Sequence, residues 1–134
     1  EGGRTMNRRV LVVDDDLPTL EVMELILRKI GCEPLVADNG MDAVHLIKAH
    51  VPELVLMDVM MSPMNGWQIL ETMMQDPEMR NVPVILFTAK RLEDEEISRY
   101  GSMVAGVLEK PISPSELRNA LQIFFDGQKI SGWA

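Results

Sequence analysis

The sequence predicts a doubly wound α/β domain, in which five parallel strands form one sheet flanked by five helices. Short apolar runs alternate along the chain with segments whose apolar residues recur at helical spacing. The apolar runs are continuous rather than alternating with polar residues, as expected of strands buried on both faces. Strands that alternate with helices pair in parallel through right-handed crossovers, so one sheet with a helix layer on each face is expected.

The apolar runs predict strands at 9–14, 33–38, 53–58, 82–88 and 105–110. The intervening segments predict helices at 17–31, 40–50, 66–75, 92–101 and 113–125. Pro18 in the first turn and Gly31 at the end mark the bounds of the first helix. Pro34 has no backbone N–H to donate, so the second strand should lie at an edge of the sheet.

The later helices carry their own start signals. Asn65 with Gln68, and Ser113 with Glu116, each form a predicted capping box, in which a side chain and a backbone N–H satisfy each other reciprocally. Pro114 stands at the first helical position of the last helix. The stretch RLEDEE (91–96) places acidic residues in a first turn, where they suit the helix dipole, and is interpreted as a solvated helix start.

The composition indicates the number of domains and argues against several classes of function. A chain of 134 residues suits one domain, expected at 8–126 between an N-terminal tail or added segment (1–7) and a C-terminal tail or linker stub (127–134). A net charge of −8 argues against a nucleic-acid surface, and no apolar run approaches the length of a membrane span. A single cysteine, Cys32, and no visible signal peptide fit a cytoplasmic protein.

Charged and polar residues stand where the predicted strands end. Asp14 and Asp15 follow the first strand, Asp58 ends the third, Thr88 the fourth and Lys110 the fifth. Taken singly, each is an ordinary capping, turn or solvated residue. In open parallel sheets, however, ligands bind outside the carboxyl ends of the strands. We therefore expect these five side chains to form one cluster.

The expected cluster has the composition of a metal-assisted phosphoryl site. Three carboxylates balance the charge of one divalent cation and the Lys110 ammonium, and oxygen ligands without His or Cys favour Mg²⁺ over zinc. An Asp carboxylate can act as a nucleophile and form an aspartyl phosphate. The metal and Lys110 would neutralise charge on the transferring oxygens, and the Thr88 hydroxyl could donate to one of them.

Four motifs in order, VLVVDDD, LMDVMMSPMNG, FTAK and LEKP, resemble the receiver domains of two-component response regulators. The resemblance covers about residues 8–125. It implies the flavodoxin-like strand order 2-1-3-4-5, which agrees with the edge position inferred from Pro34. It also implies a phosphorylatable switch that changes a partner-binding surface and is not an enzyme beyond its own phosphorylation and dephosphorylation.

The resemblance implies a role for each site residue. Asp58 would be the phosphoacceptor, supplied by a histidine kinase or a histidine phosphotransfer domain. Mg²⁺ would be bound by Asp58, by Asp15 directly, by Asp14 mainly through water, and by the backbone carbonyl of Met60.

Thr88 and Lys110 would bind the phosphoryl group, and the peptide between Lys110 and Pro111 would be cis. The expected partners beyond the phosphodonor are an effector domain absent from this chain and a second copy docked through the fourth helix, fifth strand and fifth helix. Because the chain begins with Glu1, we expect a receiver excised from a longer protein.

The sequence departs from the family pattern at two places. Ser62 precedes Pro63, where the family has Pro one residue earlier, and Val107 stands where many receivers carry Tyr or Phe. Three alternatives stay open. These are a receiver fold without the chemistry, an Asp-nucleophile phosphatase, which would usually have a second Asp at the position of Met60, and a flavodoxin, whose phosphate Asp14–Asp16 would repel.

Overall fold

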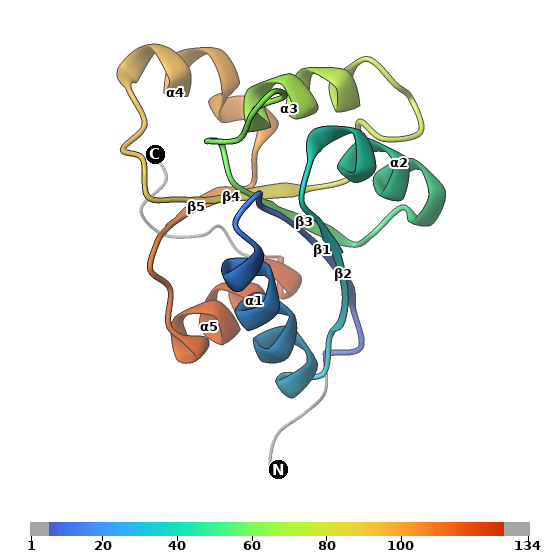
Figure 1. Ribbon diagram of the computed structural model, residues 1–134, viewed down its shortest axis with the longest axis vertical. Coiled ribbons are helices and arrows are strands. Elements are labelled where there is room, and N and C mark those ends of the chain that lie inside the picture. Colours follow the sequence, from blue (N-terminus) through green and yellow to red (C-terminus); the bar gives the residue numbers. More distant parts are fainter. Residues whose placement is uncertain (1–5, 128–134) are drawn as a thin grey trace.

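The computed structural model describes residues 6–127 and contains the predicted sheet (Figure 1). Five parallel strands lie in the order β2-β1-β3-β4-β5, which confirms both the fold class and the edge position of the Pro34 strand. The strands are β1 (Arg9–Val13), β2 (Glu33–Ala37), β3 (Leu54–Met57), β4 (Val84–Thr88) and β5 (Gly106–Glu109). The helices are α1 (Leu17–Lys29), α2 (Gly40–His50), α3 (Gly66–Met74), α4 (Asp94–Tyr100) and α5 (Pro114–Phe125), with a short 3₁₀ turn, η1 (Gly101–Met103), after α4.

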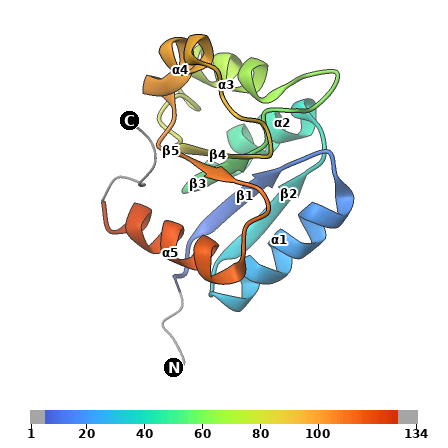
Figure 2. The ribbon, with the colours of Figure 1, turned by 90° about the vertical axis from the view of Figure 1, so that its left-hand side faces the viewer.

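The helices form two layers. Helices α1 and α5 cover one face of the sheet, and α2, α3 and α4 cover the other (Figures 1 and 2). Side chains of successive strand residues project to opposite faces, so each buried strand supplies both layers. In β1, Leu11 and Val13 pack toward α2 and α3, whereas Val10 and Val12 pack toward α1 and α5. Two separate cores result, joined through the strand backbones.

Strands β1, β2, β3 and β5 each end one residue earlier than predicted. The sheet assignments stop at Val13, Met57 and Glu109, so Asp14, Asp58 and Lys110 lie one residue beyond their strands. The backbone N–H of each of the three still donates to a carbonyl of a neighbouring strand, so the difference is the one residue by which assigned element ends usually vary.

The predicted helix signals are present. Asp16 caps α1, with Pro18 in its first turn, and Gly31 follows the helix at a φ of 88°, a conformation that glycine adopts without strain. Capping boxes begin α3 and α5 as expected. Within residues 6–127, no helix has the length and apolarity needed to cross a membrane.

Gly66, the first residue of α3, sets how closely this helix approaches the loop after β3. Its N–H donates to the Val59 carbonyl at 3.0 Å. A Cβ at this position would lie 2.5 Å from the Asp58 carbonyl oxygen and 2.9 Å from the Val59 Cα. These are backbone atoms that cannot rotate away. The absence of a side chain at Gly66 therefore permits the observed position of Asp58.

We predict that Gly66→Ala destabilises the domain by about 1–3 kcal/mol, the usual effect of overpacking a closed site. Gly40→Ala is the comparison variant, because the atoms nearest its Cβ would be side-chain atoms of Met64, at 2.6 Å from Sδ and 2.8 Å from Cβ and Cγ, rather than backbone atoms. Urea unfolding of both variants measures the difference. Equal stabilities would contradict the role assigned to Gly66.

Candidate functional site

The site lies at the carboxyl edge of the sheet, where one ammonium group joins two carboxylates. Lys110 Nζ contacts Asp14 Oδ2 at 2.5 Å and Asp58 Oδ2 at 2.9 Å. It also lies 4.9 Å from the centroid of the Phe87 ring, a cation–π distance. The strand ends thus bring together residues 96 and 52 positions apart in the chain.

The backbone fixes each member of this group. The Asp14 N–H donates to the Ala37 carbonyl at 3.1 Å, and the Asp58 N–H donates to the Val13 carbonyl at 3.0 Å. The Lys110 N–H donates to the Thr88 carbonyl at 3.1 Å. The peptide between Lys110 and Pro111 is cis, as expected. The side chains are therefore presented by the extended sheet rather than by free loops.

Burial and the contacts among the charged groups shift the pKa values of Asp14 and Lys110. The side chains of Asp14 and Asp58 are 1% and 8% exposed. Burial raises the pKa of the Asp14 carboxyl above its ordinary value, and hydrogen bonds from Lys110 and from the Asp16 N–H offset only part of this rise. Burial also disfavours the Lys110 ammonium, but its hydrogen bonds to Asp14 and Asp58 outweigh burial and raise its pKa. Lys110 therefore stays charged at neutral pH.

Of the three carboxylates expected in one cluster, Asp14 and Asp58 contact the Lys110 ammonium, and their role with Asp15 as metal ligands stays a prediction. Within residues 6–127, no three acidic, histidine or cysteine side chains are arranged to hold a metal ion. Asp14 is buried directly after β1, whereas Asp15 lies in the bend that follows and is exposed. Asp15 instead lines a pocket of about 510 Å³ together with Met60, Trp67 and Lys90. The oxygen donors suit Mg²⁺ in kind, but Lys110 is the cation that contacts Asp14 and Asp58.

Thr88 is the last residue of β4, and its side chain is buried rather than solvated, with 1% of the residue exposed. The pairing of Met57 with Leu86 places Thr88 on the strand neighbouring Asp58, at the same edge. Its Oγ1 accepts a hydrogen bond from the Lys90 N–H at 3.1 Å. Among the described residues, the Thr88 hydroxyl proton has no acceptor, so this donor is available to a ligand at the edge.

The loop after Asp58 contains the Ser62–Pro63 pair and holds the Asp58 carboxylate through its backbone. The Met60 N–H donates to Asp58 Oδ1 at 3.1 Å, which orients the carboxylate. Met61 packs into the core while Met60 is 59% exposed. The peptide between Ser62 and Pro63 is cis.

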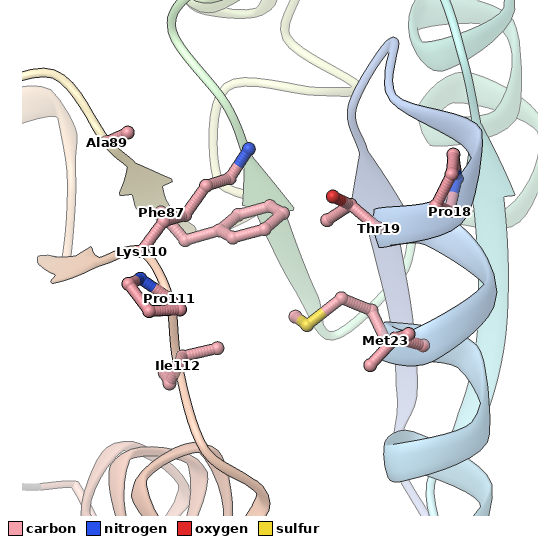
Figure 3. Close-up of a pocket in the computed structure, with 9 residues that line it drawn as sticks. Pro18, Thr19, Met23, Phe87, Ala89, Lys110, Pro111 and Ile112 are labelled. Atoms are coloured by element: carbon pink, nitrogen blue, oxygen red, sulfur yellow. The ribbon is translucent and has the colours of Figure 1, made fainter.

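A second pocket, of about 480 Å³, lies between α1 and the segment after β5, and Lys110 is part of its lining (Figure 3). Its lining is apolar and comes from α1, the end of β4 and the segment after β5, with Met23, Phe87, Pro111 and Ile112 among its residues. Next to it, α1 exposes Leu17, Val22 and Leu25 by 54–69%. The site is therefore bordered on this side by an apolar surface.

The structure also shows polar residues that sequence reasoning missed. The interpretation of 91–96 as a solvated helix start is wrong for Glu96, whose side chain is 15% exposed. Glu96 Oε2 accepts a hydrogen bond from Trp67 Nε1 at 2.9 Å and pairs with the Lys90 ammonium. Trp67 lines the same pocket as Asp15. No periodicity signals Glu96, because its partners come from α3 and the loop after β4.

The fold and this centre define a class of α/β domains with an Asp–Lys group at the carboxyl edge of a flavodoxin-like sheet. The chain belongs to the response regulator receiver domain family, whose model matches residues 10–122. It is thus a receiver domain of two-component signalling.

Known relatives support this assignment. The chain is 31% identical over 119 residues to protein PilH of Pseudomonas aeruginosa, covering 89% of this chain and 98% of that protein. It is 30% identical over 112 residues to the phosphate regulon transcriptional regulatory protein PhoB of Escherichia coli, covering 84% of this chain and 49% of that protein. The chain thus spans about half the length of the PhoB proteins it matches.

Solved structures of receiver domains are similar to this chain. The N-terminal domain of a response regulator receiver protein from Methanoculleus marisnigri is 37% identical, with a TM-score of 0.75 over 86% of this chain and 94% of that one. The receiver domain of the sensor histidine kinase PA1611 from Pseudomonas aeruginosa shares the fold, with 24% identity and a TM-score of 0.81 over 90% of this chain and 99% of that one. That structure holds a magnesium ion coordinated in its active-site cleft.

We predict that Asp14→Asn stabilises the metal-free domain, because it removes a buried charge while Lys110 keeps Asp58 as its partner. The expected rise in Tm is a few degrees, as about 1 kcal/mol produces in a domain of this size.

The pH dependence of this change in Tm tests the role of the buried Asp14 charge. The pKa of Asp14 is raised in the folded state, so folding is favoured by its protonation below the unfolded pKa, and this contribution is lost as pH rises through the folded pKa. The difference in Tm between Asp14→Asn and the parent should therefore be largest near pH 7 and shrink toward pH 4. Thermal scans in EDTA measure it, and a difference independent of pH would contradict the assignment.

Proposed function

We propose that Asp58 accepts a phosphoryl group from a phosphohistidine donor, and that the added charge switches a partner-binding surface in phosphorelay signalling. The contact of the Lys110 ammonium with both Asp14 and Asp58 carries this proposal. A lysine between two buried carboxylates can turn toward the oxygens of a phosphoryl group that arrives on one of them.

The residues present support each step of the transfer. An Asp58 oxygen forms a bond to phosphorus as the P–N bond of the donor breaks, and the imidazole nitrogen leaves with the electron pair. Lys110 neutralises charge on the transferring oxygens, and the Thr88 hydroxyl donates a hydrogen bond to one of them. The Met60 N–H holds the other side of the Asp58 carboxylate in place. These donors lie at one edge of the sheet before the transfer takes place.

Mg²⁺ is the cation proposed for this site. Asp15, Asp58 and the Met60 carbonyl would bind it directly, and Asp14 mainly through water. When bound, it supplies charge neutralisation for the phosphoryl oxygens. Asp15 is exposed beside Met60 in the same pocket, so its carboxylate is accessible to an ion from solvent. The magnesium in the PA1611 receiver domain supports this choice.

The proposed phosphodonor is a histidine kinase or a histidine phosphotransfer domain that packs on the apolar side of the site. Its phosphohistidine must come within bonding distance of Asp58, so its surface covers the neighbourhood of Lys110. The apolar pocket lined by Lys110 and Pro111 offers that surface (Figure 3), together with the exposed Val22 and Leu25 of α1. An effector domain, or a second copy docked through α4, β5 and α5, is the proposed reader.

Incubation with Mg²⁺ and acetyl phosphate should add one phosphoryl group to the protein. Intact-mass spectrometry should show an adduct that hydroxylamine removes, that EDTA prevents and that Asp58→Asn lacks. An adduct of equal yield on Asp58→Asn would overturn the assignment of Asp58. Absence of an adduct from both acetyl phosphate and a phosphorylated histidine phosphotransfer domain would favour a receiver fold without the chemistry.

Leu25→Lys should slow transfer from a phosphorylated histidine phosphotransfer domain while leaving acetyl phosphate labelling unchanged. A charge placed in an apolar contact that costs about 1.4 kcal/mol lowers the rate about tenfold. Met41→Lys is the matched control, because Met41 is 80% exposed on α2, on the opposite face of the sheet. Equal transfer rates for the two variants would place the donor elsewhere.

A further inference from the structure

One carboxylate joins three segments beside the site. Glu96 Oε2 accepts from Trp67 Nε1 of α3 at 2.9 Å and pairs with the ammonium of Lys90 in the loop after β4. Glu96 Oε1 accepts from the Glu93 N–H at the start of α4, at 2.9 Å. The position of α4 relative to α3 and to this loop therefore depends on how a single side chain is shared.

The same two helices meet through a stacked aromatic pair. The rings of Trp67 and Tyr100 lie 4.4 Å apart at an interplanar angle of 8°, and both residues are buried. The Tyr100 hydroxyl donates to Glu71 Oε2 of α3 at 3.1 Å. Helix α4 has only seven residues, so these contacts hold both of its ends against α3. A movement of the Glu96 carboxylate therefore alters its hydrogen bond with the Trp67 indole, which stacks on Tyr100.

Lys90 connects this group to the edge of the sheet at which Asp58 lies. Its N–H donates to Thr88 Oγ1, and its side chain lines the same pocket as Asp15 and Met60. An aspartyl phosphate would place a charge of about −1.5 to −2 beside that pocket. This charge competes with the single carboxylate of Glu96 for the Lys90 ammonium, and it also attracts the Thr88 hydroxyl, which is the acceptor of the Lys90 N–H.

The charge on Glu96 is secure over the pH range in which the site would work. Burial raises the pKa of its carboxyl, but hydrogen bonds from the Glu93 N–H, Lys90 and Trp67 outweigh burial, and the net pKa lies below its ordinary value. Glu96 is therefore an anion while it holds the Lys90 ammonium and the Trp67 indole.

We propose that Glu96 couples the phosphorylation state of Asp58 to the position of α4, by sharing its carboxylate between the Lys90 ammonium and the Trp67 indole. This inference rests on the proposed phosphoacceptor function. In the unmodified protein Glu96 holds both partners. Phosphorylation withdraws Lys90, and the freed carboxylate changes its hydrogen bond to Trp67 and the packing of the indole on Tyr100.

The chain offers a direct probe. It contains two tryptophans, so Trp133→Phe leaves Trp67 as the single emitter. We would record its fluorescence before and after labelling with Mg²⁺ and acetyl phosphate, with the extent of labelling taken from intact mass. The parent should change its emission intensity by at least a tenth. Glu96→Gln, which keeps an oxygen acceptor for the indole but carries no charge, should lose most of that change at equal labelling.

Two further variants separate coupling from support of the helix. Glu95→Gln removes the same charge from the neighbouring exposed position of α4 and should keep the full response. Lys90→Gln removes the competing ammonium while leaving the Glu93–Glu96 capping contacts intact, and should lose the response as Glu96→Gln does. A normal circular dichroism spectrum and Tm confirm that each variant is folded.

The outcomes are distinct. A parent that takes no phosphoryl group overturns the proposed function, and the coupling falls with it. A labelled parent whose Trp67 emission is unchanged, or labelled Glu96→Gln and Lys90→Gln variants that keep the full response, overturns the coupling alone. Loss of the response in Glu95→Gln as well would assign the effect to the net charge of α4 rather than to Glu96.

Discussion

The arrangement of the site depends on one interaction, the contact of the Lys110 ammonium with the carboxylates of Asp14 and Asp58. Two buried anions at the ends of adjacent strands would repel each other and disfavour the fold. Lys110 neutralises part of that charge and is itself kept charged by it. Because Lys110 follows β5 while the aspartates follow β1 and β3, the interaction also ties the edge of the sheet to its centre.

The close approach of backbone around Asp58 is the second constraint. The segment after β3 runs directly under the first turn of α3, where Gly66 leaves no room for a Cβ. Two hydrogen bonds to this segment, from Gly66 to the Val59 carbonyl and from Met60 to Asp58 Oδ1, hold its course. The carboxylate is therefore positioned by main-chain geometry on both sides.

Much of the fold and part of the site could be predicted from the sequence. Each strand is a continuous apolar run that ends at a polar residue, and the topology of parallel sheets brings those ends together. This reasoning located Asp14, Asp58, Thr88 and Lys110 at one edge, and Pro34 identified the edge strand. It does not distinguish Asp15 from Asp14, because the bend that leaves Asp15 exposed and Asp14 buried has no signal in the sequence.

The contacts of Glu96 could not be predicted for a different reason. They depend on the angle and distance at which α4 packs on α3, which no local pattern encodes. In sequence, Glu96 is one of several acids at a helix start. Only the packed structure distinguishes it from the exposed Glu95 beside it. The surroundings of Val107 are likewise visible only in the fold. Val107 is half-buried on the edge strand and lines a pocket together with Lys90 and the residues that follow it.

The separation of the core into two layers has a consequence for how such a domain can diversify. Met23, Phe87 and Ile112, which line the apolar pocket beside Lys110, belong to the layer of α1 and α5, whereas Trp67 and Tyr100 belong to the other. The layers share strand backbones but no side chains, so substitutions that repack one leave the contacts of the other intact. Selection could therefore alter recognition on one face and response on the other as two nearly independent traits.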